Sequence, residues 1–281
     1  MKLVRYGSPG QERPGLMDEN GTLRDLSGEV PDIDLRHLPP GGLDALKKLD
    51  AAALPAVEGK PRLGPPVAGV HNVLGIGLNY RDHAQETGIP LPAEPVLFNK
   101  HTGSLAGPDD PVALPLHSRR TDWEVELVVV VGDRLHNADE NTAADAIAGY
   151  MVGNDLTERG YQTERGGQWV KGKSLPGYAP VGPWFVTADQ VPDPQNLRLW
   201  LTLNDRPMQD STTAHMVVPP ARLVSYVSTF CPLEPGDLLF TGTPAGVGMG
   251  QRPQRFLEPG DVLHVGIDGL GEQRQAMKRG G

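Results

Sequence analysis

The chain has 281 residues, 38% of them hydrophobic, which suffices for one large domain or for one domain with a small appendage. The net charge of -9 and the lack of a basic run interleaved with aromatic residues argue against binding to nucleic acid or to an anionic membrane. No apolar leader opens the sequence, no apolar stretch approaches about 18 residues, and Cys231 is the single cysteine, so we expect a cytoplasmic protein without an intrachain disulfide.

A small N-terminal α+β domain is expected over residues 1–65 and the main domain over residues 66–281. The first contains a predicted strand at residues 2–6 and a predicted helix at residues 43–54, where leucines recur at helical spacing. Residues 61–70 are rich in proline and glycine and predict a linker. The 35 glycines, 28 prolines and few aromatic residues favour a loop-rich, β-rich α+β fold over a helical bundle.

The main domain is expected to alternate short strands with short helices. A helix is predicted over residues 79–88, with Asn79 as a suitable N-cap and Gly88 as a suitable stop. Residues 156–169 are polar and carry paired glycines, which is typical of a mobile loop or of a partly helical crossing. The other predicted elements are strands at residues 72–78, 95–100, 182–187 and 197–203 and helices at residues 139–148 and 219–230.

Residues 121–132 predict the strand around which this domain is organised. Side chains alternate along a strand, so Glu124 and Glu126 share one face, which continues with the apolar Val128 and Val130. The opposite face is aliphatic, as in a strand that is covered on both sides. Burying an unpaired carboxylate is costly, and these two glutamates therefore need a cation.

A half-exposed strand with solvated glutamates is the simpler alternative for an isolated Glu-x-Glu pair. Two downstream residues weigh against it. Asp155 ends the short apolar run at residues 149–155, and Lys173 belongs to a lysine pair in an otherwise weakly charged segment. We interpret three carboxylates and a lysine, each at or near the end of an apolar strand, as one site.

Two further segments carry chemistry. His83 and Glu86 are at i and i+3, so they share one face of their helix. They form either an exposed charge pair or a general base, in which the carboxylate orients and polarises the imidazole on a short helix that closes as a lid. Residues 241–248 form a glycine-rich loop after a strand, which predicts backbone N–H groups that bind a carboxylate.

Six short motifs follow one another in the main domain: residues 77–86 (GLNYRDHAQE), 124–126 (EVE), 154–155 (ND), 172–174 (GKS), 180–184 (PVGPW) and 236–244 (GDLLFTGTP). In this order, and over about residues 70–275, the chain resembles the fumarylacetoacetate hydrolase family. The resemblance implies a mixed β-roll or half-barrel fold in a catalytic domain at residues 66–281, a homodimer and a bound metal ion.

The resemblance also implies roles for nine residues. Lys173 would be the catalytic lysine, and His83 with Glu86 the lid dyad. Ligands that are all oxygen donors favour a hard cation, Mg²⁺ or alternatively Mn²⁺ or Ca²⁺, over zinc. The metal ligands would be Glu124, Glu126 and Asp155, and the residues in contact with an oxo-acid substrate would be Arg159, Gln162 and Thr243.

Segments at both chain ends are similar to those of bacterial members called 2,4-diketo-3-deoxy-L-fuconate hydrolases, some of which are labelled ureidoglycolate lyases. The polar segment around Arg159, Gln162 and Arg165 agrees with a substrate tail that offers hydroxyls or a carboxylate. We therefore expect a metal-dependent hydrolase that cleaves a C–C bond of a 2,4-diketo acid. The acid would be an acylpyruvate or, with such a tail, a 2,4-diketo-3-deoxy sugar acid, and the products pyruvate and a second acid.

Three alternatives stay open. An oxaloacetate decarboxylase would use the same metal and lysine without an activated water. A lyase or isomerase of another small oxo acid, such as a ureidoglycolate lyase, would use His83 and Glu86 for proton transfer alone. A non-catalytic protein that binds small acids would leave this pair without a role.

Overall fold

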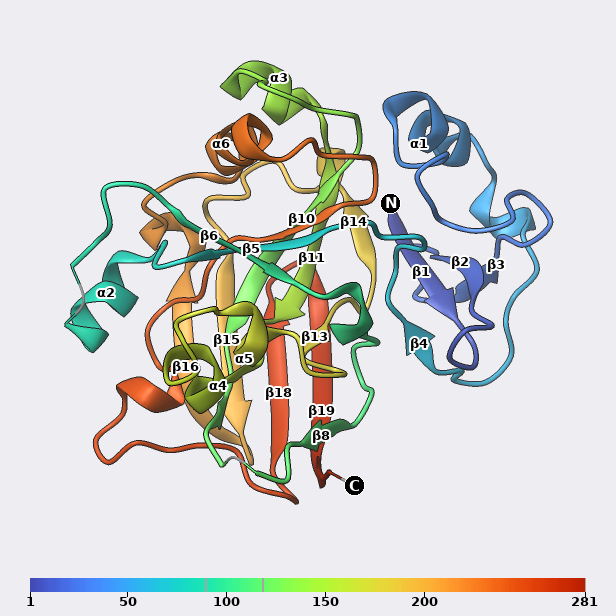
Figure 1. Cartoon of the computed structure of the whole chain (residues 1–281). Helices are drawn as coiled ribbons and strands as arrows, with labels where there is room; N and C mark the ends of the chain where they lie inside the picture. Colours follow the sequence, from blue (N-terminus) through green and yellow to red (C-terminus); the bar gives the residue numbers. More distant parts are fainter. Residues whose placement is uncertain (89, 118, 281) are drawn as a thin grey trace.

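A sheet of ten strands runs through the whole molecule (Figure 1). The structure is a computed structural model and describes residues 1–88, 90–117 and 119–280. In sheet order, with β4 (Leu63–Gly64) attached to β1, the strands are β3 (Leu23–Asp25), β2 (Arg13–Met17), β1 (Lys2–Tyr6), β14 (Phe185–Thr187), β11 (Ile147–Asn154), β10 (Val125–Val131), β17 (Leu238–Phe240), β5 (Val73–Gly77) and β6 (Val96–Lys100).

A second sheet of five strands packs against one face of the long sheet. Leu199 and Val265 of this sheet belong to the same hydrophobic core as Leu127 and Val129 of β10. The β-rich α+β class predicted from the sequence is thus confirmed. The five strands are β16 (Arg206–Thr212), β15 (Arg198–Leu203), β18 (Val262–Ile267), β19 (Gly271–Arg279) and β8 (Val112–Leu114), and two separate pairs are β12 (Thr157–Glu158) with β9 (Thr121–Asp122) and β13 (Ala179–Pro180) with β7 (Leu105–Ala106).

The helices are short and lie around the sheets. In Figure 1, α3 and α6 lie together at the top, α4 and α5 lie next to each other in front of the strands, and α2 lies at the outer edge. The helices are α1 (Pro40–Lys47), α2 (Arg81–Thr87), α3 (Glu140–Asp145), α4 (Arg159–Thr163), α5 (Val170–Lys173) and α6 (Pro220–Phe230), with 3-10 turns at Ala51–Ala53, Thr102–Ser104, Ala188–Gln190, Thr213–His215 and Gly248–Gly250.

β10 separates two hydrophobic cores, as the alternation of its side chains predicts. Leu127 and Val129 pack in the core shared with the five-stranded sheet, whereas Val128 and Val130 pack with residues of the N-terminal segment such as Leu3. Every residue of the strand is buried, because β11 and β17 also cover its two edges. Any charged side chain on β10 is therefore held away from water.

The strand predicted at residues 121–132 is interrupted after Asp122. Side chains take the amide hydrogens of the next two residues: Trp123 N donates to Asp122 Oδ1 at 2.9 Å, and Glu124 N donates to Asn154 Oδ1 at 3.1 Å. These bonds replace the strand ladder at this point, so β9 and β10 form in place of one long strand.

Two predicted helices are shorter than expected. The helix predicted at residues 43–54 splits into α1 and a 3-10 turn, because the Asp50 carboxylate accepts a hydrogen bond from Ala52 N and caps a new turn. The helix predicted at residues 139–148 is reduced to α3, because Ile147 already pairs with β10. Pairing in the sheet outweighs the helix propensity of the alanines here.

Asn79 does not cap α2, contrary to the prediction. Its side-chain amide donates to the carbonyls of Val218 at 3.0 Å and Thr241 at 2.9 Å, and its Oδ1 accepts from Val218 N at 2.9 Å. The helix begins only after Tyr80, which makes no side-chain capping bond. The predicted end is confirmed, because Gly88 adopts a left-handed φ of 67° that suits glycine.

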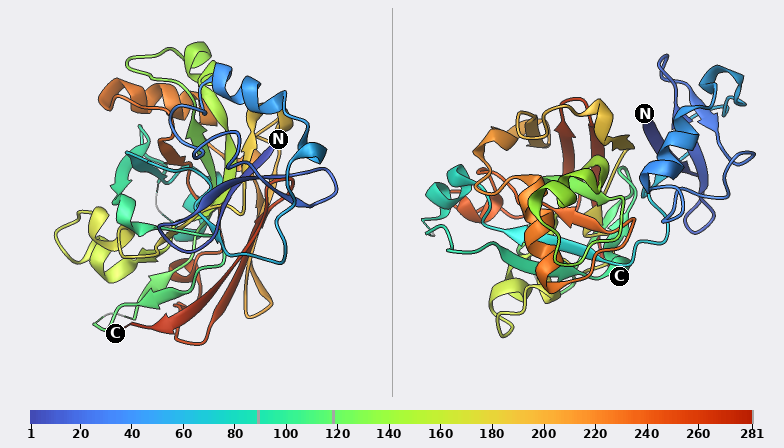
Figure 2. Two further views of the ribbon diagram at one scale, coloured as in Figure 1. Left: turned by 90° about the vertical axis from the view of Figure 1, so that its right-hand side faces the viewer. Right: turned by 90° about the horizontal axis from the view of Figure 1, so that it is seen from above.

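The N-terminal segment extends the long sheet. Seen from above it lies at one side of the molecule (Figure 2, right), and β1 pairs with β14 through Lys2 and Val186. Residues 61–70, predicted as a linker, contain β4, which pairs with β1. The domain boundary near residue 65 stays a prediction.

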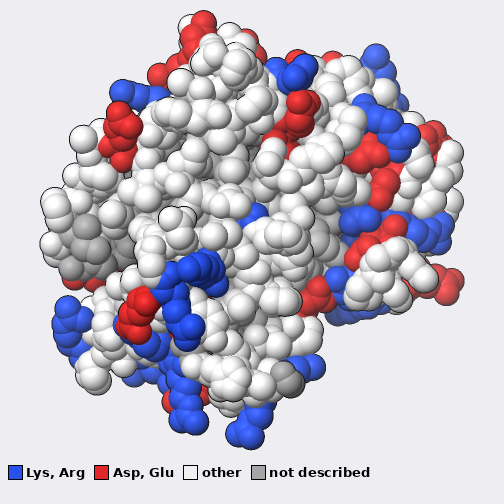
Figure 3. Space-filling view, in the orientation of Figure 1, with Lys and Arg blue, Asp and Glu red and all other residues white. Residues whose placement is uncertain are grey.

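Two properties of the molecule concern its surroundings. No helix in the described ranges combines the length and the apolar character needed to cross a bilayer. On the face drawn in Figure 3, lysine and arginine side chains are interspersed with aspartate and glutamate, and the centre is mostly uncharged apart from a small basic patch. That face presents no continuous basic track.

Candidate active site

Three carboxylates meet where the two central strands lie next to each other, and we call Glu124, Glu126 and Asp155 the carboxylate cluster. Glu124 directly precedes β10 and Asp155 directly follows β11, which is antiparallel to it and pairs Asn154 with Val125. One oxygen from each carboxylate lies within 4.8 Å of the other two, and all three residues are buried. The sequence predicted this grouping, because each residue adjoins the end of an apolar run.

Three buried cations surround the cluster. Lys173 Nζ donates to Glu124 Oε2 at 2.7 Å and to Asp155 Oδ2. Lys100 Nζ donates to the other oxygen of Asp155, and Arg159 Nη2 lies 2.7 Å from Glu124 Oε1. Burial opposes ionisation of Glu124, yet Lys173 and Arg159 lower the pKa of its carboxyl to about 2.

Glu126 differs from Glu124 and Asp155 in its contacts. Its Oε2 accepts a hydrogen bond from Gly242 N at 2.8 Å, and within the described ranges no lysine or arginine forms an ion pair with it. Burial, together with the charges of Asp155 and Glu124, raises the pKa of Glu126 well above its usual value. The carboxylate cluster consists of oxygen donors, and its member Glu126 has no cationic partner among the described residues. Such a cluster fits a hard divalent cation, and binding of that cation would favour the ionised form of Glu126.

Arg159 is anchored from behind by Asp122. Its Nε donates to Asp122 Oδ2 at 2.9 Å, and the Asp122 carboxylate accepts from the amides of Gly248 at 2.7 Å and Met249 at 3.0 Å. Arg159 Nη1 donates to Gln162 Oε1 at 3.2 Å. Arg159 Nη2 makes ion pairs but has no well-aligned acceptor in the described structure, so it can still donate to an anionic ligand.

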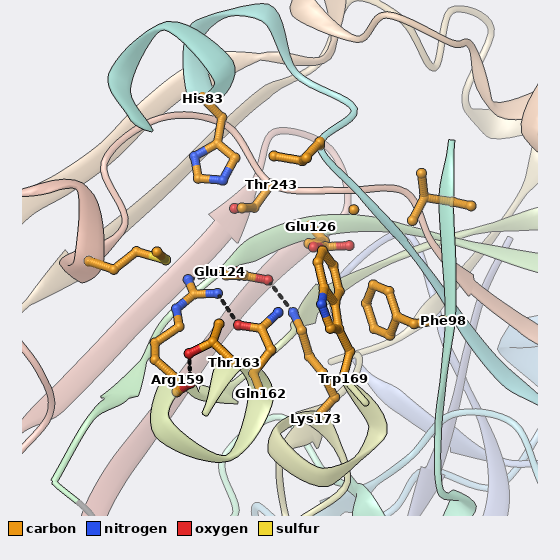
Figure 4. A pocket seen from close by; sticks show the side chains of 14 residues that line it. His83, Phe98, Glu124, Glu126, Arg159, Gln162, Thr163, Trp169, Lys173 and Thr243 are labelled. Atoms are coloured by element: carbon orange, nitrogen blue, oxygen red, sulfur yellow. Dashed lines mark hydrogen bonds and ion pairs between the residues drawn. The ribbon is translucent and has the colours of Figure 1, made fainter. Parts of the chain in front are cut away.

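His83 reaches over the pocket from α2, opposite α4 and α5 (Figure 4). The side chain is buried, which argues against the exposed charge pair that the sequence left open. Its Nδ1 lies 3.4 Å from Glu86 Oε2, near the upper limit for a hydrogen bond, and Glu86 Oε1 accepts from Gly246 N at 2.9 Å. The Glu86 carboxylate thus connects α2 to the glycine-rich loop that contains Gly246.

The glycine-rich loop predicted to bind a carboxylate does so, but the carboxylates belong to the protein. Three of its amides reach three different parts of the site: the carboxylate cluster, the lid pair and the support of Arg159. A role in binding the carboxylate of a substrate stays a prediction. The three amide–carboxylate pairs are Gly242 with Glu126, Gly246 with Glu86 and Gly248 with Asp122.

The pocket below His83 has a mixed lining. Thr243 lines it, and its predicted contact with a substrate stays a prediction, because its hydroxyl donates to Val125 O and accepts from Gln209 Nε2, each at 2.9 Å. Arg159, Gln162, Lys173 and the two glutamates of the cluster contribute the other polar groups that the sequence predicted. The apolar part of the lining consists of Ile76, Leu78, Phe98, Trp169 and Met249.

Two charged residues of the site were not predicted, and two others lie elsewhere than predicted. Lys100 and Asp122 were not predicted; for Lys100 the available signal was a lysine that ends an apolar strand. Lys173 lies on α5 and not at the end of a strand. Arg165 is exposed, with its guanidinium 5.2 Å from the centre of the Tyr161 ring, and does not line the pocket.

The chain is similar in sequence to a known protein family and to proteins of other bacteria. Residues 72–278 match the family model described as fumarylacetoacetate (FAA) hydrolase C-terminal. A Burkholderia cenocepacia protein that is provisionally named a hydrolase is 52% identical over 99% of both chains.

Similar solved structures include two named reaction types. The 2-hydroxyhepta-2,4-diene-1,7-dioate isomerase of Mycobacterium marinum is 29% identical, with a TM-score of 0.77 over 100% of this chain and 99% of that chain. The maleylpyruvate hydrolase of Sphingobium sp. SYK-6, solved with manganese(II) and pyruvate, is 26% identical, with a TM-score of 0.84 over 100% of both chains.

Proposed function

Because the chain belongs to the fumarylacetoacetate hydrolase family, we propose that it is a metal-dependent hydrolase that cleaves the C3–C4 bond of a 2,4-diketo acid to give pyruvate and a second acid. One observation carries the proposal. The buried His83, paired with the partly exposed Glu86, faces Glu124, Glu126 and Lys173 across one pocket, so a base and a charged oxo-acid site share the same space.

The carboxylate cluster would hold the cation, and its oxygen donors suit Mg²⁺ or Mn²⁺, with Ca²⁺ as the alternative. Bound there, the cation would supply Lewis-acid polarisation of the oxo-acid head. The manganese(II) and pyruvate in the maleylpyruvate hydrolase structure support this choice.

Arg159 is suited to bind the C1 carboxylate of the substrate. Its guanidinium is buried, permanently charged and fixed by Asp122, and a carboxylate is the group that a fixed guanidinium recognises best. Gln162 lies beside it in the lining and can add a hydrogen bond from its amide. Binding at this end would direct the C4 carbonyl away from Arg159 and toward the lid.

His83 would then act on water. With Nδ1 facing Glu86, the other ring nitrogen, Nε2, accepts a proton from the water that attacks C4, and the Glu86 carboxylate stabilises the imidazolium that forms. The C3–C4 bond breaks, and its electron pair forms the enolate of pyruvate. C3 then takes up a proton, and C4 leaves as the carboxyl group of the second acid.

Lys173 lines the pocket and would stabilise the developing enolate charge. Burial lowers its pKa, but Asp155 and Glu124 outweigh burial and raise the pKa above its usual value, so the ammonium stays charged. A charged group that is fixed before the reaction begins stabilises an enolate oxygen without reorganisation.

An isomerase of a small oxo acid is the second candidate. The structural likeness to the Mycobacterium marinum isomerase favours it, and the same pocket would serve if His83 only moved a proton between carbons. The two reactions differ in whether water enters the product and whether pyruvate is released.

The test uses the metal-loaded enzyme in H₂¹⁸O with acetylpyruvate, oxaloacetate and an unsaturated 2-hydroxy dienoate. Pyruvate release in a coupled assay, with ¹⁸O in the acetate formed from acetylpyruvate, supports the proposal. A shift of the diene absorbance without pyruvate release from any diketo acid would assign the isomerase reaction. Pyruvate from oxaloacetate alone would assign a decarboxylase.

A further inference from the structure

The apolar lining of the pocket contains a pair of aromatic rings, Phe98 and Trp169, which we call the aromatic wall. Phe98 and Trp169 lie with their ring centres 5.4 Å apart, on the other side of Glu124 from Arg159 in Figure 4. Lys173 Nζ lies 4.8 Å from the centre of the Phe98 ring. The wall therefore begins next to the charged head of the site.

β5 makes room for this wall by lacking side chains. A Cβ atom on Gly75 would come within 2.3 Å of the Phe98 ring, and one on Gly77 within 2.5 Å of the Trp169 ring. Real Cβ atoms do not approach so closely, so both rings rest directly on the strand backbone. The two rings are held in place and present a fixed apolar surface.

Leu78 adds to this surface from an unfavourable backbone conformation. Its φ of 58° is left-handed, a region in which glycine or asparagine is the usual residue. The side chain is partly exposed and lines the pocket, where Met249 is also partly exposed. A large apolar side chain kept at a strained position beside the site indicates a binding role.

Several polar groups of the lining already form hydrogen bonds within the protein. Thr243 donates to Val125 O, the exposed Thr163 donates to Arg159 O at 2.8 Å, and the Gln162 carbonyl accepts from Arg159. If Arg159 and the Gln162 amide bind the head of the substrate, few donors or acceptors are left for a tail. A tail with several hydroxyls would leave some of them buried without partners, which weakens binding.

We propose that the acyl tail of the substrate is apolar, an alkyl or unsaturated chain or a ring, and not a polyol. The proposal rests on the proposed function, whose oxo-acid head it shares. Between the two substrate classes expected from the sequence, it selects the acylpyruvates over the diketo sugar acids. The polar segment that favoured a sugar-acid tail does not argue against this, because Arg165 lies outside the pocket and Arg159 and Gln162 are assigned to the head of the substrate.

The test compares two six-carbon ligands that differ only in three hydroxyls: 2-oxohexanoate and 4,5,6-trihydroxy-2-oxohexanoate. Binding of each to the Mg²⁺-loaded enzyme is measured by titration calorimetry. We expect the first to bind about tenfold tighter or more, the effect of leaving one or more buried hydroxyls unpaired. Equal affinities, the reverse order or undetectable binding of 2-oxohexanoate would overturn the inference.

A variant shows whether the pocket wall causes the preference. Leu78→Asn suits the left-handed backbone and makes the wall polar, so the protein should fold and the preference for 2-oxohexanoate should fall several-fold. Leu116→Asn, at an exposed leucine outside the pocket, is the matched control and should keep the preference. An unchanged preference in Leu78→Asn would also count against the inference. Hydrolysis of acetylpyruvate is measured separately, so a failure of the proposed function is told apart from a failure of the tail assignment.

Discussion

Replacing Lys100 by methionine tests the charge balance of the carboxylate cluster. The ammonium is fully buried and donates to Asp155, whereas methionine fills a similar volume without charge. Removing one partner of a buried ion pair costs about 3–5 kcal/mol of stability, because the remaining charge is left without compensation. Lys173 still contacts Asp155, so we expect the lower end of this range, about 3 kcal/mol.

The same substitution should strengthen cation binding. Losing a positive charge beside Asp155 makes the cluster more negative, so we expect the affinity for Mg²⁺ to rise about tenfold, even though the metal-free protein is less stable. Urea denaturation gives the first quantity and titration calorimetry the second. Lys171→Met, on the same helix as Lys173 but exposed, is the control and should change stability by less than about 0.5 kcal/mol. A Lys100→Met variant with wild-type stability and wild-type Mg²⁺ affinity would refute the reasoning.

Three further predictions address other parts of the site. Glu126→Gln should abolish turnover and markedly weaken Mg²⁺ binding in calorimetry. The raised pKa of Glu126 means that, above about pH 4.5, the folded protein keeps a proton that the unfolded chain releases. The stability of the metal-free protein should therefore fall as the pH rises, and it should fall less steeply in this variant. His83→Ala should keep metal and analogue binding but slow hydrolysis of acetylpyruvate about 10²–10⁴-fold in the coupled assay; a wild-type rate would place water activation elsewhere. Gly250→Ala would put a Cβ atom 2.4 Å from Glu86 Cδ and so displace the lid carboxylate, lowering kcat with unchanged Mg²⁺ affinity, whereas Gly41→Ala, where nothing lies within 4 Å, should leave kcat unchanged.

The sequence predicted the carboxylate cluster because its members adjoin apolar runs that can be read locally. Glu124 directly precedes β10, Glu126 is the second residue of β10 and Asp155 directly follows β11, and antiparallel pairing of the two strands brings such ends together. Lys100 could not be assigned in the same way, because its contact with Asp155 spans two strands that are not neighbours in the sheet. A lysine at a strand end is more often solvated, and only the tertiary structure shows that this one is buried.

The limits of helix and strand were harder to predict, because local side chains and distant partners decide them. Asn79 has the right chemistry for an N-cap, yet it bonds to Val218 and Thr241 instead, and neither contact can be read from the local sequence. The apolar, aromatic part of the pocket lining was also not predicted from the sequence. Phe98 and Trp169 are far apart in the sequence, and the glycines that let their rings rest on β5 carry no side-chain signal.

Before the chain is folded, the segment that becomes β10 is prone to aggregate. Apart from Glu126 it consists of β-branched and aliphatic residues, without proline or glycine, a composition that favours association of strands between chains. In the native protein β17 covers one of its edges, but β17 is synthesised long after β10. Glu124 and Glu126 are the only charges in residues 123–131. We therefore expect these two proposed metal ligands also to oppose association between nascent chains. Neutralising either glutamate should therefore lower the soluble yield on expression, independently of any effect on catalysis.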